Sequence, residues 1–309
     1  MAVFLSDYLP DTDEYSQQQI VAKGLDWSKV EANRRPFQSV EPQDISGMIQ
    51  PRIPFSHKGT YGHALIVAGA PETMGAALIA AKGCLHAGAG LTTACIPESG
   101  LVALNTAMPE VMYLSRDAIS NSGTKYLDKY NSIAVGPGLG TSAQHLLQAI
   151  LSHKRPIVVD ADAINILSVQ QKMLYELAPN SILTPHMKEF DHLFGTHKTW
   201  WDRLQTAISK AIELGIVIVL KNRFTFIIDQ NGRVAINTTG NAAMAQGGMG
   251  DALTGIIVAF LAQGYQPKYA AILGVYFHGK AADELANNKF SITANELILQ
   301  LSQTIKRHP

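Results

Sequence analysis

Short β-rich runs that alternate with helical runs constrain the fold of this 309-residue chain more than any other feature. The strand-like runs cover residues 63–70, 91–96, 132–138, 156–162, 181–186 and 216–222. Helical patterns lie between them over 75–90, 142–154 and 200–214. Strands that alternate with helices form βαβ units, whose crossovers put helices on both faces of a mainly parallel sheet. The sequence therefore predicts an α/β fold.

One segment departs from this alternation. In FTFIIDQNGRVAIN (224–237), the pair Asn231-Gly232 separates two β-rich runs, and this combination favours a tight hairpin turn. We therefore predict a small antiparallel hairpin near one edge of the sheet. From residue 251 onward the pattern is almost entirely helical.

Charge and composition exclude several classes of function. Lys and Arg total 25 and Asp and Glu total 25, so the zero net charge argues against binding to nucleic acid or an anionic membrane. The chain has neither a run of about 18 uncharged apolar residues nor the basic flank of a signal peptide. Cys84 and Cys95 follow no metal-ligand spacing and are expected to be reduced core residues. These features predict a cytoplasmic globular protein.

The N-terminal segment differs from the rest of the chain. Residues 1–45 are polar, rich in Asp, Gln, Ser and Pro, and lack sustained periodicity. The Pro- and Gly-containing stretch PRIPFSHKGTYG (51–62) precedes the first clear strand. We therefore predict an N-terminal arm over 1–45 and a single domain over 46–309.

The stretch QGGMGDALTG (246–255) places three glycines before an acid and a helix. Apolar residues repeat at helical spacing just after it, at Leu253, Ile256, Ile257, Phe260 and Leu261. In one interpretation, Asp251 is only the N-cap of this helix. In the other, the glycines let backbone N–H groups bind a phosphate at the helix N-terminus, and Asp251 takes the proton from an attacking hydroxyl. No Walker motif occurs in the chain.

The segment NTTGNAAMAQGGMGDALTGI (237–256) resembles the signature of the ADP/ATP-dependent NAD(P)H-hydrate dehydratases, a branch of the ribokinase-like superfamily. Further resembling segments follow the family's order over 56–70, 74–91, 135–140, 158–167 and 183–190. The resemblance covers roughly residues 50 to 290. It implies a ribokinase-like three-layer α/β/α sandwich with a central, mainly parallel sheet and a small antiparallel edge hairpin.

The resemblance also implies a reaction. Such enzymes use a nucleotide with Mg²⁺ to dehydrate the S form of hydrated NADH or NADPH, releasing AMP and phosphate when ADP is the donor. By this resemblance Asp251 is the base that activates the hydrate hydroxyl, and Gly248 and Gly250 form the anion hole. ADP is favoured over ATP as the donor because bacterial relatives favour ADP, and an N-terminal arm that resembles a fused partner is typical of bacteria. The family further implies a homotetramer.

Other residues receive roles from the family in the same way. The substrate-binding positions, besides Asp251, are Ala76, Gly136, Gly138 and His186. The nucleotide-binding positions are Lys221, Asn222, Arg223, Phe224, Thr225 and Gly250. Glu189 is expected to place Mg²⁺ through water. Each role has a structural alternative: for His186 and Glu189, a helix cap with a first-turn carboxylate.

Four more polar residues are candidates. Asp160 and Asp162 follow a strand, where they either contact a metal or a hydroxyl or, for Asp162, cap the next helix. Asn241 either shapes the glycine loop or is a turn residue. His278 lies in a helix among apolar residues and is expected to be a structural histidine with its hydrogen bonds satisfied.

Two further functions remain open at this stage. One is a ribokinase-like kinase that phosphorylates a small alcohol or a hydroxymethylpyrimidine, and the other is a nucleotide-binding sensor without catalysis. Residues 21–32 and 40–59 resemble the tail of an epimerase that is fused to the dehydratase in many bacteria, together with its linker. Because about 50 residues are too few for that epimerase domain, we expect no epimerase activity.

Overall fold

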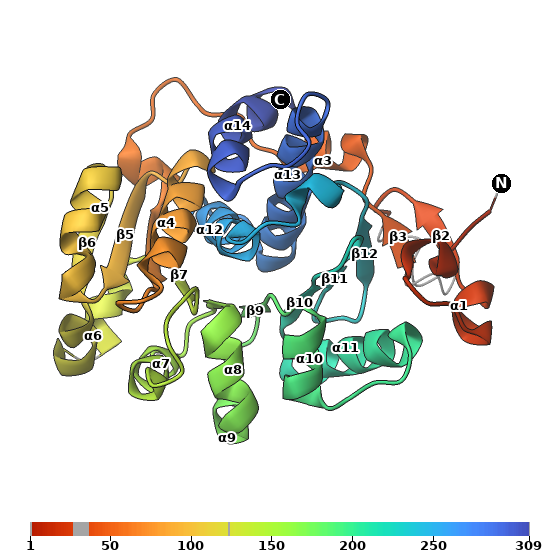
Figure 1. The fold of residues 1–309 in the computed structure, drawn as a ribbon, viewed down its shortest axis with the longest axis horizontal. Helices are drawn as coiled ribbons and strands as arrows, with labels where there is room; N and C mark the ends of the chain where they lie inside the picture. Colours follow the sequence, from red (N-terminus) through yellow and green to blue (C-terminus); the bar gives the residue numbers. More distant parts are fainter. Residues whose placement is uncertain (1, 27–36, 123, 309) are drawn as a thin grey trace.

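The computed structural model describes residues 2–26, 37–122 and 124–308. Its central feature is a twelve-stranded sheet with the order β1-β2-β3-β12-β11-β10-β9-β8-β7-β4-β5-β6 (Figure 1). The strands are β1 (Val3–Phe4), β2 (Ile20–Lys23), β3 (Phe37–Ser39), β4 (His63–Val67), β5 (Leu91–Ile96), β6 (Met112–Ser115), β7 (Ser132–Val135), β8 (Val158–Val159), β9 (Ile182–Leu183), β10 (Val217–Leu220), β11 (Thr225–Ile228) and β12 (Val234–Asn237).

The block from β10 to β6 is entirely parallel, which confirms the predicted α/β class. In its central pair, His63 of β4 lies opposite Leu91 of β5, and Val67 lies opposite Cys95. Every predicted strand from 63–70 to 216–222 contains an observed strand, although β8 and β9 have only two residues each.

The hairpin predicted over 224–237 forms from β11 and β12, which pair antiparallel, and β11 pairs antiparallel with β10. Asp229 stabilises the turn because its Oδ1 accepts hydrogen bonds from the backbone N–H of Asn231 and Arg233. The N-terminal arm then continues the sheet beyond the hairpin. Strand β3 pairs parallel with β12, β2 pairs with β3, and β1 pairs antiparallel with β2.

Helices cover both faces of the sheet (Figure 1). One hydrophobic cluster joins the sheet to α3 (Pro42–Met48), α4 (Met74–His86), α5 (Leu101–Ala107), α12 (Met249–Ala262), α13 (Pro267–Ala286) and α14 (Ala294–Lys306). The second joins it to α6 (Arg116–Ser122), α7 (Gln144–Leu151), α8 (Ala161–Val169), α9 (Gln171–Leu174), α10 (Met187–Phe194) and α11 (Trp200–Leu214). In β4, Ala64 and Ile66 face the first cluster, whereas Leu65 and Val67 face the second.

Shorter helices connect these elements. They are η1 (Leu5–Tyr8), α1 (Glu14–Gln18), η2 (Lys58–Tyr61), η3 (Glu98–Gly100), η4 (Thr124–Lys129) and η5 (Ala242–Met244). Cys84 and Cys95 are buried and unpaired, as predicted for core cysteines. A search of the described helices finds none with the length and apolarity needed to cross a membrane.

The sheet changes direction between β4 and β7. From β4 the chain builds outward to β5 and β6 on one side, and to β7, β8, β9 and β10 on the other. In open α/β sheets, ligands bind at the carboxyl ends of the strands next to such a switch point. The segments after β4, β7, β8, β9 and β10 therefore meet at one edge of the sheet, and most of the predicted site residues lie there or at the start of α12.

Candidate active site

The glycine loop ends at Gly248, the N-cap of α12. Its φ is 88°, in the left-handed region, and a Cβ atom there would lie 2.7 Å from Cδ1 of Ile79. A residue without a side chain is therefore required for the chain to enter α12. Asp251 is the third residue of this helix, so the interpretation of Asp251 as the N-cap was wrong. The carboxylate belongs to the first turn, where the helix dipole favours negative charge.

The Asp251 carboxyl group has an unusual environment. Burial, and after it the charge of the nearby Asp160, raise its pKa to about 6, although Lys221 acts in the opposite direction. Asp162 and Glu189 also contribute to the increase. Within the described residues, the carboxylate of Asp251 makes no hydrogen bond. A carboxylate held without a partner, with a pKa close to neutral pH, has the properties of a general base.

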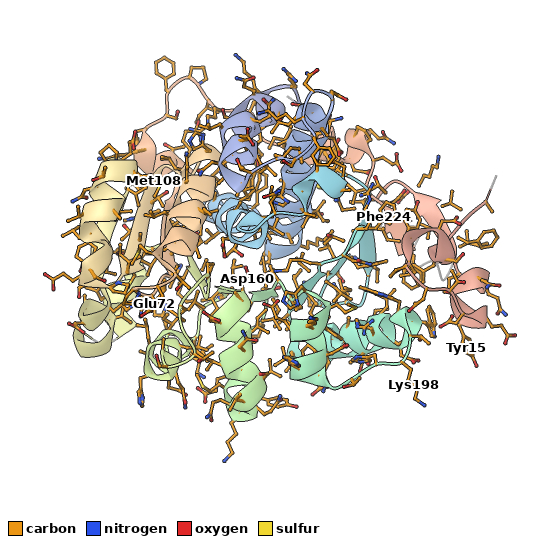
Figure 2. The ribbon with its side chains drawn as sticks, viewed as in Figure 1. Tyr15, Glu72, Met108, Asp160, Lys198 and Phe224 are labelled. Atoms are coloured by element: carbon orange, nitrogen blue, oxygen red, sulfur yellow. The ribbon has the colours of Figure 1, made fainter. Side chains whose placement is uncertain are left out.

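Asp160 is the buried residue that joins two other side chains of this site. It follows β8, is only 1% exposed, and lies near the centre of the view between α8 and α12 (Figure 2). Its Oδ1 accepts a hydrogen bond from Nζ of Lys221 at 2.9 Å, and its Oδ2 accepts one from the Thr254 hydroxyl at 2.6 Å. Asp160 thus ties the end of β10 to α12, and both of its carboxylate oxygens already have protein partners.

Lys221 is the cation of the site. Burial alone lowers the pKa of its ammonium group, but Asp160 and then Glu189 outweigh burial and hold that pKa above its ordinary value. A Cβ atom on Gly250 would lie 3.5 Å from Lys221 Nζ, so the ammonium sits against the first turn of α12. A fixed positive charge beside helix N–H groups is suited to bind phosphate.

His186 and Glu189 form a capping box at the start of α10. The His186 N–H donates to Glu189 Oε2 at 2.8 Å, and His186 Nδ1 accepts from the Glu189 N–H at 3.1 Å. The predicted cap is therefore present. The His186 side chain is nevertheless 52% exposed, and its other ring nitrogen, Nε2, lies 3.5 Å from Glu189 Oε1. The pair lies beside Lys221, because the Lys221 N–H donates to the Pro185 carbonyl.

The glycine turn after β7 brings two predicted substrate positions together. A Cβ atom on Gly138 would lie 2.9 Å from Cβ of Ala76, and the Thr73 hydroxyl donates to the Gly138 carbonyl at 2.7 Å. Gly136, with φ 131°, lies so close to the Asp160 carbonyl that any side chain would overlap it. The close approach of the Asp160 carbonyl therefore explains why position 136 is a glycine, without any contact to a substrate.

A cavity of about 360 Å³ opens beside Lys221 and Gly250. It lies between the β10–β11 turn, the loop from β12 to α12, the first turns of α12, and one side of α13. Most of the predicted nucleotide positions line it, namely Lys221, Asn222, Arg223, Thr225 and Gly250, together with Asn241. Phe224 does not line the cavity; its ring packs edge-on against Tyr8 of the arm at 5.2 Å between centroids. The volume falls within the usual range for small-molecule sites.

Asn241 and His278 also belong to this cavity. Asn241 caps η5, and its Nδ2 donates to Asp283 at 2.8 Å, so it fixes the loop as a turn residue would. His278 is 8% exposed, and its Nε2 has no hydrogen-bond partner among the described residues. The expectation of a fully satisfied structural histidine was therefore wrong. Burial lowers the pKa of His278 to about 4, so its imidazole is neutral near pH 7.

Sequence analysis missed two residues that hold the site together. Thr254 binds Asp160, and Arg116 reaches across from α6 to the carbonyls of Ala68, Gly69 and Leu139. Arg116 thereby links the loop after β4 to the glycine turn after β7. Thr254 lies in the signature over 237–256 but received no role there, and Arg116 belongs to no motif, because each acts through partners far away in sequence.

The described residues contain no group of three His, Cys, Asp or Glu side chains arranged to hold a metal. Asp160 is occupied by Lys221 and Thr254, and Glu189 is partly occupied by its capping box. The described residues therefore give no support for a metal ion that is bound directly by several side chains. Mg²⁺ usually keeps several waters and contacts few carboxylates, so the prediction for Glu189 remains a prediction.

The fold and the site together define a ribokinase-like enzyme class. A ribokinase-like superfamily protein from Enterococcus faecalis superposes with a TM-score of 0.81 and 27% identity, covering 89% of this chain and 97% of that one. The NAD(P)H-hydrate dehydratase family matches residues 64–306. The chain belongs to this family, which confirms the resemblance seen in the sequence.

Two further relatives describe the match in more detail. The Bacillus subtilis ADP/ATP-dependent NAD(P)H-hydrate dehydratase, co-crystallised with ATP/Mg²⁺, has a TM-score of 0.78 and 31% identity, and the match covers 87% of this chain and 98% of that one. The bifunctional NAD(P)H-hydrate repair enzyme of Escherichia coli is 34% identical over 96% of this chain and 56% of its own length. The chain spans about half the length of the bifunctional relatives.

The pKa of Asp251 predicts a pH profile for the site. A base acts only when ionised. If Asp251 has this role, kcat/KM is expected to fall about tenfold per pH unit below pH about 6 and to level off above it. The measurement is kcat/KM for nucleotide-dependent turnover from pH 5 to pH 8, with nucleotide affinity followed over the same range. A flat kcat/KM with constant affinity would remove Asp251 from the base role.

Proposed function

We propose that this chain is a nucleotide-dependent dehydratase that acts on the S form of hydrated NADH and NADPH, with ADP as the favoured donor. In the reaction, the hydrate hydroxyl attacks the terminal phosphoryl group of ADP, and AMP leaves. Elimination of phosphate, with loss of a proton from the neighbouring ring carbon, then restores the double bond of the reduced nicotinamide ring. The observation that carries this proposal is the Asp251 carboxylate beside the glycine loop and Lys221, which makes no hydrogen bond with the residues that the structure describes. The identity of the substrate is inferred from the family to which the chain belongs.

Each residue of the site has a physical task in this reaction. Asp251 takes the hydroxyl proton as the oxygen attacks, because its raised pKa makes the carboxylate a competent base near neutral pH. The backbone N–H groups around Gly248 and Gly250 and the Lys221 ammonium stabilise the charge on the transferring phosphoryl group. Asp160 keeps Lys221 in place.

The substrate and the nucleotide enter from different sides. The hydrated nicotinamide ring lies between His186, with its exposed imidazole, and the wall formed by Ala76 and Gly138. The nucleotide occupies the cavity lined by Lys221, Arg223 and Gly250. In this proposal Asp251, at the start of α12, lies between the two. This arrangement brings the hydroxyl and the phosphoryl group together next to the base.

The donor groups near Asp251 fit a hydrated magnesium ion. Asp162 and Glu189 both lie close enough to raise the pKa of Asp251, and the excess of carboxylates over Lys221 favours a bound cation. Oxygen ligands are those that Mg²⁺ prefers, and most of them are waters at nucleotide sites. When bound, Mg²⁺ would neutralise charge on the phosphates. Glu189 is the residue that would hold it through water.

The competing function is a ribokinase-like kinase that stops at the phosphorylated product. The test incubates the protein and Mg²⁺ with hydrated NADH, with small alcohols and with a hydroxymethylpyrimidine, each with ADP and separately with ATP. The proposal predicts that NADH absorbance returns only with a nucleotide, and faster with ADP. Nucleotide consumption on the alcohols with no return of NADH would favour the kinase.

The remaining proposals concern the arm, assembly and location. We divide the chain into an arm over 1–45 and a dehydratase domain over 46–309, and we propose a cytoplasmic homotetramer. The E. coli match supports the relation of the arm to bifunctional enzymes, since it extends over 96% of the chain. Size-exclusion chromatography with light scattering tests the tetramer, and a monomer at micromolar concentration would contradict it.

Epimerase activity is not expected from this chain. With pure R hydrate of NADH and ADP, NADH is expected to return only at the spontaneous rate of epimer interconversion. The measurement compares this rate with and without protein, and pure S hydrate serves as the positive control. Interconversion accelerated by the purified chain would contradict the assignment of the arm.

A further inference from the structure

The loop between β12 and α12 forms one wall of the nucleotide cavity. Four consecutive residues of this loop line the cavity, namely Thr239, Gly240, Asn241 and Ala242. On α13, Val275 and Gly279 line the same cavity, and Asp283 follows at the same four-residue spacing. Residues at this spacing share one face of a helix, so Asp283 lies on the face of α13 that meets the loop.

Both carboxylate oxygens of Asp283 are hydrogen-bonded to this wall. Oδ2 accepts a hydrogen bond from the backbone N–H of Gly240 at 3.0 Å, and Oδ1 accepts one from Nδ2 of Asn241 at 2.8 Å. Asn241 continues the network, because its Oδ1 accepts from the backbone N–H of Ala243 at 3.0 Å. Hydrogen bonds to an ionised group are about twice as strong as neutral ones. Asp283 thus holds two neighbouring residues of the wall at once.

The two ends of the wall have anchors of their own. At the start, the Thr239 hydroxyl donates to the Tyr276 carbonyl at 3.0 Å. At the end, the Ala243 carbonyl accepts a hydrogen bond from the backbone N–H of Ile292 at 3.0 Å. Loss of the Asp283 bonds is therefore expected to release residues 240–242 locally, while the flanking residues stay attached.

We propose that Asp283 is a positioning residue for nucleotide binding, which holds Gly240 and Asn241 in the conformation that forms the cavity wall. This inference rests on the proposed nucleotide site. Without the Asp283 carboxylate the wall adopts other conformations as well, and only molecules with a formed wall bind nucleotide. The apparent dissociation constant then rises in inverse proportion to the fraction of such molecules.

Two substitutions test these hydrogen bonds directly. In Asp283→Asn an NH₂ group replaces one oxygen and must face a donor, either the Gly240 N–H or the Asn241 NH₂ group. In Asn241→Asp an oxygen replaces Nδ2 and faces the Asp283 carboxylate. The double variant Asn241→Asp/Asp283→Asn exchanges donor and acceptor. Its new amide donates to the new carboxylate and still accepts from the Gly240 N–H, so all three hydrogen bonds can form.

The effect of Asp283→Asn is expected to reverse with the residue at position 241. In calorimetric titration of the full chain, it should weaken ADP binding about tenfold in the wild-type background and strengthen it about fivefold in the Asn241→Asp background. Repulsion between ADP and the new charge at position 241 is present in both members of the second pair and cancels. If Asp283→Asn alone does not fold, this second pair still gives the sign of the effect.

Glu284→Gln is the matched control. Glu284 is the neighbouring acid on α13, and its carboxylate binds α14 instead, where it accepts from Gln300 Nε2 and from the Thr304 hydroxyl at 2.8 Å each. This variant is expected to lower the melting temperature but to keep ADP affinity within about twofold of wild type. Thermal unfolding of every variant is measured beside the titrations.

The outcomes separate this inference from the proposed function. ADP affinity that Asp283→Asn leaves unchanged in both backgrounds would overturn the positioning role, even with a lower melting temperature. Equal weakening in both backgrounds would overturn it too. If wild-type protein binds neither ADP nor ATP, the nucleotide site fails, and the proposed function fails with it. If ADP binding follows the prediction but hydrated NADH is not converted, the proposed reaction fails and the role of Asp283 stands.

Discussion

The Asp251→Asn variant is expected to lose dehydratase turnover by about 10²- to 10⁴-fold or more while it continues to bind ADP. The amide keeps the size of the side chain but cannot accept the hydroxyl proton. The measurements are the rate of NADH return from its hydrate and calorimetric titration with ADP. Turnover within about threefold of wild type would show that another group is the base.

Stability provides a second readout for the same variant. The pKa of Asp251 is raised in the folded protein, so ionisation of this carboxyl destabilises the fold as pH rises past the unfolded value toward about 6. Asp251→Asn removes that charge and is expected to have a melting temperature at pH 8 at least equal to wild type. Asp202→Asn is the matched control, because Asp202 is an exposed acid in the first turn of α11. The control should leave turnover unchanged.

The second large effect is expected for Lys221→Met, which leaves the Asp160 carboxylate buried without its cation. Asp160 is 1% exposed, and breaking a buried ion pair from one side typically costs about 3–5 kcal/mol of stability. Adding Asp160→Asn to the same chain removes the uncompensated charge, and most of the loss should return. Urea unfolding of both single variants and the double variant measures this coupling.

Lys210→Met is the control for this experiment. Lys210 forms an ion pair with Glu213 that is more exposed than the Lys221 pair, and exposed ion pairs contribute little to stability. The account would be contradicted if Lys221→Met and Lys210→Met unfolded at the same urea concentration.

The double variant Lys221→Met/Asp160→Asn also tests the role of Lys221 in nucleotide binding. It should bind ADP about 10- to 100-fold more weakly, since a charged hydrogen bond to phosphate is lost.

The parts of the fold that could be predicted are those whose structure depends on residues close together in the sequence. The run LTTACI is β-rich over its whole length and forms β5, and the predicted helix 200–214 coincides with α11. The turn at Asn231-Gly232 has its own backbone preference and forms the predicted hairpin. Likewise, the glycines around 248 and the acid after them indicate a phosphate site from sequence alone.

The arm was harder to interpret because its structure depends on a distant partner. Strands β1, β2 and β3 have only two to four residues, too few for a periodic pattern. They form because β12 leaves an open edge, with which β3 pairs from about 200 residues away in the chain. A segment of this kind has no local signal that distinguishes a strand from a polar loop.

The electrostatics of the site also depend on long-range contacts. Asp160 meets Lys221 from 61 positions away and Thr254 from 94 positions away. Burial and the charge of Asp160 raise the pKa of Asp251, and the contacts with Lys221 and Thr254 occupy the Asp160 carboxylate that sequence analysis considered for a metal. The free nitrogen of His278 is visible only once α13 packs beside the first turn of α12. Asp251 could thus be singled out from the sequence, whereas its electrostatic environment depends on the fold.

The stoichiometry of one reaction tests the central claim most directly. The protein is given pure S hydrate of NADH with limiting ADP and Mg²⁺, and NADH, AMP and phosphate are quantified at completion, with Asp251→Asn as the blank. The account predicts one NADH, one AMP and one phosphate for each ADP consumed, and none of these above background in the blank. ADP consumption without the return of NADH, or equal yields from Asp251→Asn, would contradict it.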